Sequence, residues 1–188
     1  MSKPRFFLVA PDGLADDAIA AAATTAVKAG DCASILVDDK IGAATVAALQ
    51  ALDLAVIIRD CEPRLVHRLK ADGIHVSRAA PVKSLRESFR NEMIGVYAAT
   101  SRHLAMEAAE SGADYVAFAQ ASQHSGEPLL SWWQEIFEIP AVAWDPVSPE
   151  ELATLLPQKP DFIRPSDDMW LSPARAAEVV AALAARVS

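Results

Sequence analysis

A short phrase recurs along the chain at nearly constant intervals: an aspartate that follows an alanine-rich stretch and opens a short apolar run. The aspartates are Asp31, Asp72, Asp114 and Asp161, which lie 41, 42 and 47 residues apart. A polar entry into a buried segment, repeated at this interval, predicts four evenly spaced parallel strands. Further strands are then expected between the copies, so the repeat limits the fold to a small set of architectures.

Four further apolar segments lie between these copies and carry β-branched or aromatic residues in most cases. They are Phe6–Ala10, Leu54–Ile58, Met93–Ala98 and Pro140–Ala143. Together the two sets make eight predicted strands, each followed by a helical pattern. Alternation of strand and helix favours a parallel sheet with right-handed crossovers. We therefore predict an α/β fold, a single-domain (β/α)8 TIM barrel over residues 1–188.

The rival architecture is an open, doubly wound sheet. Eight similar strands, their even spacing and the lack of a glycine-rich G-x-G-x-x-G motif favour the closed barrel. The length of 188 residues is short for such a barrel, which typically has about 250 residues. The sequence therefore predicts brief helices and tight loops.

Charge and hydropathy exclude several kinds of partner. The formal net charge is −8, and the 17 Lys and Arg residues are dispersed rather than gathered on one segment. Nucleic-acid binding normally demands a basic face, so we expect none. No apolar run reaches membrane-spanning length, and no targeting segment precedes the first strand. We predict a cytoplasmic protein without a membrane partner.

The two cysteines have neither metal-binding nor redox spacing. Cys32 lies at the beginning of the second predicted strand, and Cys61 lies just beyond the end of the third. These positions belong to opposite ends of a barrel, about 15 to 20 Å apart at the rise of a strand. Because a disulfide needs Cα atoms within about 7 Å, we predict two free thiols.

Barrel active sites lie where the strands end, on the loops that lead into the helices. That rule selects a ring of mostly polar residues: Asp12, Asp38, Asp39, Lys40, Arg59, Asp60, Ser77, Arg78, Thr100, Gln120, Ser122, His124, Trp144, Asp145, Arg164, Ser166 and Asp167. The cations of the ring face several carboxylates. The mixture can hold an anionic ligand, or the opposite charges can neutralise each other in the rim.

Histidine and tryptophan supply further candidates. Strand alternation directs His75 into the barrel, where a hydrogen-bonded core histidine is the simpler interpretation and proton transfer the alternative. His124, in the loop after the sixth strand, is the better candidate acid or base. Trp132, Trp133 and Trp144 indicate core packing, an interface or a pocket wall. No grouping of His, Cys and carboxylates has the spacing of a transition-metal site.

Three segments resemble the family of thiamine phosphate synthase and its TenI-like thiazole tautomerase relatives. Ala71–Val76 is similar to the family's A-D-G-V-H-L, and the resemblance extends through Ile94-Gly95-Val96 with Thr100 and through Ala108–Phe118. The resemblance implies a single-domain barrel of thiamine biosynthesis. The synthase joins a pyrimidine diphosphate to a thiazole phosphate with Mg²⁺ and expels pyrophosphate. The family's tendency also favours a homo-oligomer.

This sequence retains only some of the residues that the family carries at its site. Lys40 keeps the lysine of the motif after the second strand, whereas Leu36 and Asp38 stand in place of its glutamine and arginine. Asp60 keeps one metal-binding aspartate, preceded by Arg59 in place of asparagine, and the second metal-binding position is Ala80. The resemblance therefore implies Mg²⁺ with one acidic ligand retained.

The remaining motif positions have also changed. Tyr97 stands in place of a serine, Glu127 in place of a phosphate-binding lysine, and Asp145-Pro146 in place of a glycine pair. The position of the TenI histidine is Gln120. Like charges brought together cost on the order of several kcal/mol. We therefore do not expect the synthase reaction by the family mechanism.

These considerations predict a family member that binds a small phosphorylated or anionic metabolite in the barrel mouth. The predicted catalytic residues are His124, Lys40 and Asp60, with Asp60 as the metal ligand. The predicted substrate-binding residues are Arg59, Arg78, Gln120, Ser122, Asp145, Arg164 and Ser166. One alternative is a non-catalytic member that binds a ligand or partner. Another is an unrelated barrel enzyme with new chemistry at the ring of Asp and Arg.

Overall fold

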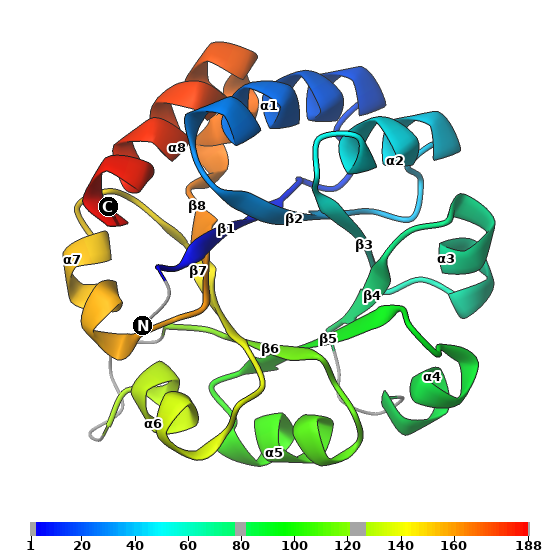
Figure 1. Ribbon diagram of the computed structural model, residues 1–188, viewed down its shortest axis with the longest axis vertical. Coiled ribbons are helices and arrows are strands. Elements are labelled where there is room, and N and C mark those ends of the chain that lie inside the picture. The colour runs from blue at the N-terminus through cyan, green and yellow to red at the C-terminus, as the bar shows by residue number, and fades with distance from the viewer. Residues whose placement is uncertain (1–2, 78–81, 121–126, 188) are drawn as a thin grey trace.

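A computed structural model describes residues 3–77, 82–120 and 127–187. Eight parallel strands close into a barrel in sequence order, with helices around it (Figure 1). The strands are β1 (Arg5–Val9), β2 (Cys32–Val37), β3 (Ala55–Arg59), β4 (Gly73–Val76), β5 (Met93–Ala99), β6 (Tyr115–Phe118), β7 (Ala141–Val147) and β8 (Phe162–Pro165). The predicted fold class is confirmed.

The helices follow the strands one by one. They are α1 (Asp16–Ala29), α2 (Ala43–Gln50), α3 (Pro63–Leu69), α4 (Val82–Ser88), α5 (Arg102–Glu110), α6 (Leu129–Ile136), α7 (Leu152–Leu155) and α8 (Pro173–Val187). Short 3-10 helices, η1 (Leu156–Gln158) and η2 (Asp167–Leu171), follow α7 and β8. Most of the helices are brief, as the chain length predicts. Within the described ranges, no helix is both long and apolar enough to cross a membrane.

The seventh unit differs most from expectation. The apolar run predicts a strand that ends at Ala143, but β7 continues to Val147 with an irregular register between these two residues. Pro146 lies in this irregular part, where a ladder donor is not required. A turn follows β7, in which the Ser148 N–H donates to Glu151 Oε2 at 2.9 Å. The α-helix begins only at Leu152.

The recurring aspartates hold the strands together where they begin. The Asp72 carboxylate accepts the Val56 N–H at 2.7 Å, at the start of β3. Asp114 does the same for Ile94 in β5 at 2.7 Å. The Asp161 carboxylate accepts the N–H of Ala141, the first residue of β7, at 2.8 Å. Each aspartate therefore satisfies a backbone donor that the barrel would otherwise leave unpaired at its N-terminal end.

The same carboxylates also bind side chains of the surrounding shell. Gln50 Nε2 donates to Asp72 at 3.0 Å, and Gln134 Nε2 donates to Asp161 at 2.6 Å. Arg86 forms an ion pair with Asp114. Asp31 departs from the pattern: its partner is the guanidinium of Arg5, at 2.9 Å, instead of a backbone N–H of β1. The sequence repeat thus has a structural cause, a strand-to-strand link at the barrel entrance.

Two apolar cores lie on the two faces of the sheet. The larger one fills the space between strands and helices, and Trp132 and Trp133 are buried there, so core packing is confirmed for this pair. The smaller core fills the barrel itself and consists of Phe7, Val9, Leu36, Ile57, Tyr115, Ala117 and Val142, with Tyr97 and Trp144 packed against it. Strand alternation produces this division, because successive side chains face opposite sides of the sheet.

Both cysteines are free thiols, as predicted. Cys32 is buried at the start of β2, and Cys61 is half-buried beyond β3. Burial raises the pKa of each thiol to about 12. Both thiols are therefore protonated near neutral pH.

Candidate functional site at the mouth of the barrel

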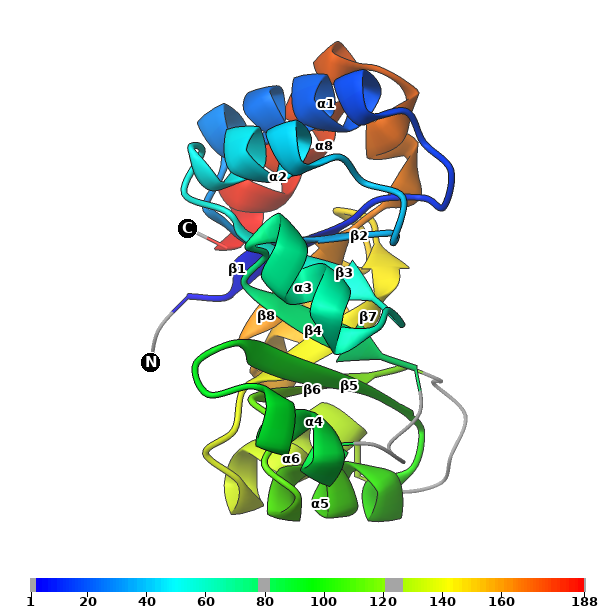
Figure 2. The ribbon, with the colours of Figure 1, turned by 90° about the vertical axis from the view of Figure 1, so that its right-hand side faces the viewer.

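The candidate site lies at the end of the barrel where the strands finish. Figure 2 shows the chain entering the barrel near its N-terminus at one end and the loops that follow the strands at the other. We call this second end the mouth. Its described members come from or follow the ends of all eight strands: Asp12, Asp38, Asp39, Lys40, Arg59, Asp60, Ser77, Tyr97, Gln120, Trp144, Asp145, Arg164, Ser166 and Asp167.

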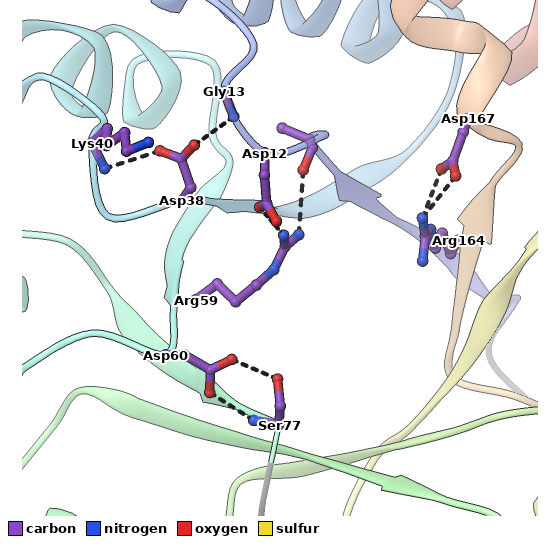
Figure 3. Close-up of polar contacts among 10 residues, drawn as sticks. Asp12, Gly13, Asp38, Lys40, Arg59, Asp60, Ser77, Arg164 and Asp167 are labelled. Atoms are coloured by element: carbon purple, nitrogen blue, oxygen red, sulfur yellow. Dashed lines mark hydrogen bonds and ion pairs between the residues drawn. The ribbon is translucent and has the colours of Figure 1, made fainter.

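Arg59, at the end of β3, reaches toward the loop that follows β1. It forms an ion pair with Asp12, and its Nη2 donates to the Ala10 carbonyl at 3.3 Å. In Figure 3 the guanidinium points toward Asp12 and away from Asp60. The Arg59 side chain is 22% exposed, against 72% for Asp12. The predicted substrate-binding charge of Arg59 is therefore already matched by a carboxylate from the neighbouring loop.

Asp38 and Lys40 follow β2, but they serve different purposes. The Asp38 carboxylate accepts the N–H of Gly13 at 2.8 Å and that of Lys40 at 2.9 Å, so it ties the loop after β2 to the loop after β1 (Figure 3). Gly13 has a φ of 75°, which glycine adopts without strain. Among the described residues, no carboxylate lies within ion-pair distance of the Lys40 ammonium. Lys40 thus keeps a cation available at the mouth.

Asp60, the predicted metal ligand, is engaged by the end of the next strand. Its Oδ1 accepts the Ser77 N–H at 2.8 Å, and its Oδ2 accepts the Ser77 hydroxyl at 2.5 Å (Figure 3). The Asp60 N–H donates to the His75 carbonyl at 2.9 Å. The residue has a φ of 43°, a conformation that aspartate tolerates better than most side chains. Asp60 therefore acts as a clasp between the ends of β3 and β4.

The arrangement around Asp60 does not fit a magnesium site of the family type. Both carboxylate oxygens already accept hydrogen bonds from Ser77. Mg²⁺ requires oxygen ligands in near-octahedral arrangement, and the second acidic position is Ala80 in this sequence. In the part of the chain that the structure describes, no three His, Cys, Asp or Glu residues are placed to hold a metal ion together. The described residues therefore offer no suitable ligand set for the Mg²⁺ that the resemblance implies.

Arg164, at the end of β8, is held between a tryptophan and an aspartate. Its Nη2 donates to both oxygens of Asp167, at 2.7 and 3.0 Å, and its guanidinium carbon lies 5.6 Å from the centre of the Trp144 ring. Figure 3 shows this contact between Arg164 and Asp167. The Arg164 side chain is 16% exposed, whereas that of Asp167 is 51% exposed. Arg164 Nε is buried and has no hydrogen-bond partner among the described residues.

Gln120 and Asp145 bind each other across the ends of β6 and β7. The Gln120 N–H donates to Asp145 Oδ2 at 2.7 Å, and the Asp145 N–H donates to Gln120 Oε1 at 3.1 Å. Ser166, after β8, donates its hydroxyl to Asp168. These three predicted substrate-binding side chains therefore already have protein partners. Their evident contribution is to fix the loop ends around Arg164 and Trp144.

The floor of the mouth consists of aromatic rings, and His75 is one of them. His75 is 1% exposed and its ring stacks on Trp144, with centres 4.6 Å apart and an angle of 3°. Its Nδ1 lies 2.9 Å from the Tyr115 hydroxyl. Burial lowers the pKa of His75 to about 3, so the ring is neutral at physiological pH. The predicted inward direction of His75 is confirmed. Tyr115 is the functional candidate that alternation in β6 would have indicated and that the sequence reasoning missed.

Three predicted site residues, Arg78, Ser122 and His124, lie outside the described residues. The same holds for Ala80. The assignment of His124 as a catalytic acid or base therefore stays a prediction.

The described mouth carries an excess of negative charge. Its cations are Lys40, Arg59 and Arg164, and its carboxylates are Asp12, Asp38, Asp39, Asp60, Asp145 and Asp167. A mouth with more carboxylates than cations repels a ligand of high negative charge, and fixed charges of the wrong sign lower affinity steeply. Of the two arginines in this set, Arg164 is the more buried, with 16% of its side chain exposed against 22% for Arg59.

A separate hollow of about 480 Å³ lies at the opposite end of the barrel. It is bordered by Pro4, Gln134, Leu156, Lys159 and Asp161, among others. None of the described predicted site residues lines it. Because Asp161 already accepts hydrogen bonds from Gln134 and from Ala141 in β7, this hollow belongs to the end that holds the strands together.

The fold and the mouth define a (β/α)8 barrel protein of the kind that presents its polar residues on the loops after the strands. The family model described as thiamine monophosphate synthase matches residues 6–163. The chain therefore belongs to this family, and the resemblance inferred from its motifs is confirmed.

Two relatives show how far the similarity extends. The thiamine-phosphate synthase of Rhodospirillum centenum is 33% identical over 199 aligned positions, which cover 96% of each chain. The thiamine-phosphate synthase of Erythrobacter litoralis is 40% identical over 125 positions, which cover 60% of this chain and 59% of that protein's length. The second match thus spans less than two thirds of its relative.

Solved structures with the same fold are more distant in sequence. The thiamine phosphate pyrophosphorylase of Pyrococcus furiosus superposes with a TM-score of 0.79 at 17% identity, over 97% of this chain and 95% of that one. A 3-hexulose-6-phosphate synthase superposes with a TM-score of 0.71 at 16% identity, over 97% and 100%. At this level of identity the likeness concerns the fold alone.

Proposed function

We propose that this protein binds a small ligand with one phosphate or similar anionic group at the mouth of the barrel. Arg164 is the principal contact, and the ammonium of Lys40, which has no ion-pair partner among the described residues, adds positive potential. We further propose that it does not catalyse the coupling that releases pyrophosphate.

The observation that carries this proposal is the pairing of Arg164 with Asp167. A mostly buried guanidinium is held by a half-exposed carboxylate through two hydrogen bonds from Nη2, at 2.7 and 3.0 Å. Guanidinium groups bind carboxylate and phosphate oxygens with similar geometry. An incoming phosphate can therefore take the place of Asp167, which has room to move into solvent. The loops after the seventh and eighth strands are also a frequent phosphate site in such barrels.

The charges elsewhere in the mouth support the second part of the proposal. Arg59 is paired with Asp12, and Asp60 is held by Ser77, so neither is available to a diphosphate or its metal. Departure of pyrophosphate requires cations or a metal ion to stabilise the developing charge. Asp38 and Glu127 occupy positions where the family resemblance implies Arg and Lys.

Binding of thiazole phosphate and of inorganic phosphate, measured by calorimetry, tests the first part. Replacing Arg164 with Gln should weaken both probes by about tenfold or more, the scale expected for loss of a charge-assisted contact. Asp167→Asn is the matched control, because it removes the internal competitor and should leave binding equal or tighter. Equal binding by the wild type and by R164Q would refute the assignment of Arg164.

A non-catalytic binding protein is the second candidate. It is favoured by the number of mouth side chains that already have protein partners, namely the pairs Arg59–Asp12, Gln120–Asp145 and Asp60–Ser77. Such pairing makes a rigid rim that can present a ligand without transforming it. Recovery of bound thiazole phosphate unchanged, by nuclear magnetic resonance after long incubation, would favour this candidate over an enzyme that acts on it.

A further inference from the structure

Two buried side-chain nitrogens in the described part of the chain lack a hydrogen-bond partner, His75 Nε2 and Arg164 Nε. Both residues lie against the same ring. His75 stacks on Trp144 at 4.6 Å between ring centres, and the Arg164 guanidinium carbon is 5.6 Å from the Trp144 ring centre. Buried polar atoms normally have partners, and leaving one unpaired is costly. Two such atoms beside one tryptophan, both without a partner among the described residues, make this place a candidate site for a bound group.

The hydrogen bond between His75 and Tyr115 determines which kind of group is missing. If the Tyr115 hydroxyl donates to Nδ1, the remaining unmet group is one donor, the N–H on Nε2. If instead Nδ1 carries the proton, both the hydroxyl proton and the Nε2 lone pair are left without partners among the described residues. The first arrangement leaves fewer buried groups unsatisfied and is therefore favoured. Arg164 Nε is also a donor, so both unpaired atoms require an acceptor.

We propose that the floor of the mouth is an acceptor-binding subsite, in which the His75 Nε2–H donates to an uncharged acceptor on a phosphorylated ligand and Tyr115 is the positioning residue that fixes this tautomer. A ring nitrogen or a carbonyl oxygen is the acceptor class that fits. The inference deepens the proposed function and rests on it, because the phosphate of the same ligand is assigned to Arg164.

The surroundings hold Tyr115 in the position that this role requires. Tyr115 is 5% exposed and lies beside His75, with ring centres 5.7 Å apart and an angle of 23°. Its ring passes over Gly95 in the neighbouring strand, where an added Cβ would lie 1.9 Å from Tyr115 Cζ. Only glycine at position 95 permits this placement. His75 is thus oriented by three strands, β4, β5 and β6.

The tautomer is tested without any ligand by the nitrogen resonances of the His75 ring in 15N-labelled protein. We expect a neutral ring with the proton on Nε2 in the wild type. Tyr115→Phe keeps the ring but removes the hydroxyl, and it should shift His75 toward the Nδ1–H form or a mixture. Tyr97→Phe is the matched control, since Tyr97 contacts Trp144 but not His75 Nδ1, and it should leave the tautomer unchanged. A wild-type ring protonated on Nδ1 would overturn the inference.

The ligand contact is tested by comparing thiazole phosphate, which has a ring nitrogen, with inorganic phosphate, which has none. We expect Tyr115→Phe to weaken thiazole phosphate about three- to tenfold, the usual scale of one hydrogen bond, and to leave inorganic phosphate unchanged. Equal weakening of both probes, or no effect on thiazole phosphate, would overturn the inference while R164Q still tests the phosphate contact. If R164Q changes neither probe, the proposed function fails instead, and the nitrogen resonances still decide the tautomer.

Discussion

The two ends of this barrel are built on different rules. At the end where the strands begin, Asp72, Asp114 and Asp161 each accept the backbone N–H of a neighbouring strand. At the mouth, each strand end carries its own arrangement: an ion pair at Arg59, a clasp at Asp60 and a stacked guanidinium at Arg164. The same hydrogen bond from a backbone N–H to an aspartate therefore recurs at the end where the strands begin, whereas these three arrangements at the mouth all differ.

The difference follows from what each end must satisfy. Three strands, β3, β5 and β7, begin with a backbone N–H that needs an acceptor, and an aspartate at the start of the next strand supplies it each time. The mouth has no such repeated requirement, and under the proposed function the charge and shape of its side chains must suit a ligand. A family scaffold can therefore persist at one end while the chemistry changes at the other.

Lowering the pH should reduce the free energy of unfolding more than any of the substitutions below. Burial lowers the pKa of His75 to about 3 from the ordinary 6.5, with nearby Asp60 raising it and Arg59 lowering it. Between these values the unfolded chain binds a proton that the folded chain does not. Stability should therefore fall as pH falls from 6.5 to 3, by about 1.4 kcal/mol per pH unit from this group. Urea unfolding across this range measures the slope.

His75→Gln is the control for that experiment. This variant lacks the titrating group. Its free energy of unfolding should therefore change less with pH than that of the wild type, by the slope that corresponds to about one bound proton. Identical slopes for the two proteins would show that His75 titrates normally and is not desolvated in the folded state.

At the opposite end, Asp114→Ala should lower the free energy of unfolding by about 2 to 3 kcal/mol, because it orphans the Ile94 N–H and unpairs Arg86. Asp114→Asn retains one acceptor oxygen and should lose about 1 kcal/mol. Denaturant unfolding compares the two variants. If both variants lose less free energy of unfolding than an exposed control such as Glu138→Ala, the recurring aspartates do not link the strands.

The mouth should tolerate its own aspartate substitution better. Asp60→Ala removes two hydrogen bonds to Ser77 at an exposed position, and we expect a loss of about 1 kcal/mol. Millimolar Mg²⁺ should leave the melting temperature of both the wild type and this variant unchanged. A rise with Mg²⁺ that disappears in the variant would establish Asp60 as a metal ligand and reverse our interpretation of the clasp.

The smallest effect is expected at the thiols. Burial raises the pKa of Cys61 to about 12, so little thiolate is present near pH 8. Iodoacetamide should alkylate Cys61 far more slowly than a free cysteine, and Cys32 only after unfolding, as followed by mass spectrometry. Rapid labelling of Cys61 in the folded protein would show that its thiol is more exposed to solvent than the half-buried position in the structure implies.

The sequence predicts the scaffold well because the scaffold depends on local patterns. The aspartate repeat, the apolar runs and strand alternation predict eight strands, the closed barrel and the inward direction of His75. The longer β7 could not be foreseen, because its extension to Val147 depends on pairing with Pro165 across an irregular register. Such pairing depends on neighbouring strands rather than on the strand itself.

The site was less predictable because its contacts join loops far apart in the chain. Arg59 was predicted to bind substrate, and the sequence did not identify its partner Asp12, which lies 47 residues away. The bond between His75 and Tyr115 requires the stagger of β4, β5 and β6, which no single segment encodes. The positions of the strand ends predict the candidate site residues. Which of these side chains are free to bind a ligand depends on the contacts that they make in the folded barrel.

We propose that the mouth has lost the cations and metal ligands of the coupling reaction while the scaffold of the family is retained. Pyrophosphate release from the pyrimidine diphosphate and thiazole phosphate substrates, with Mg²⁺ and purified protein, tests it directly. We predict release no faster than without protein. Mg²⁺-dependent release that is abolished in Asp60→Ala would contradict the account.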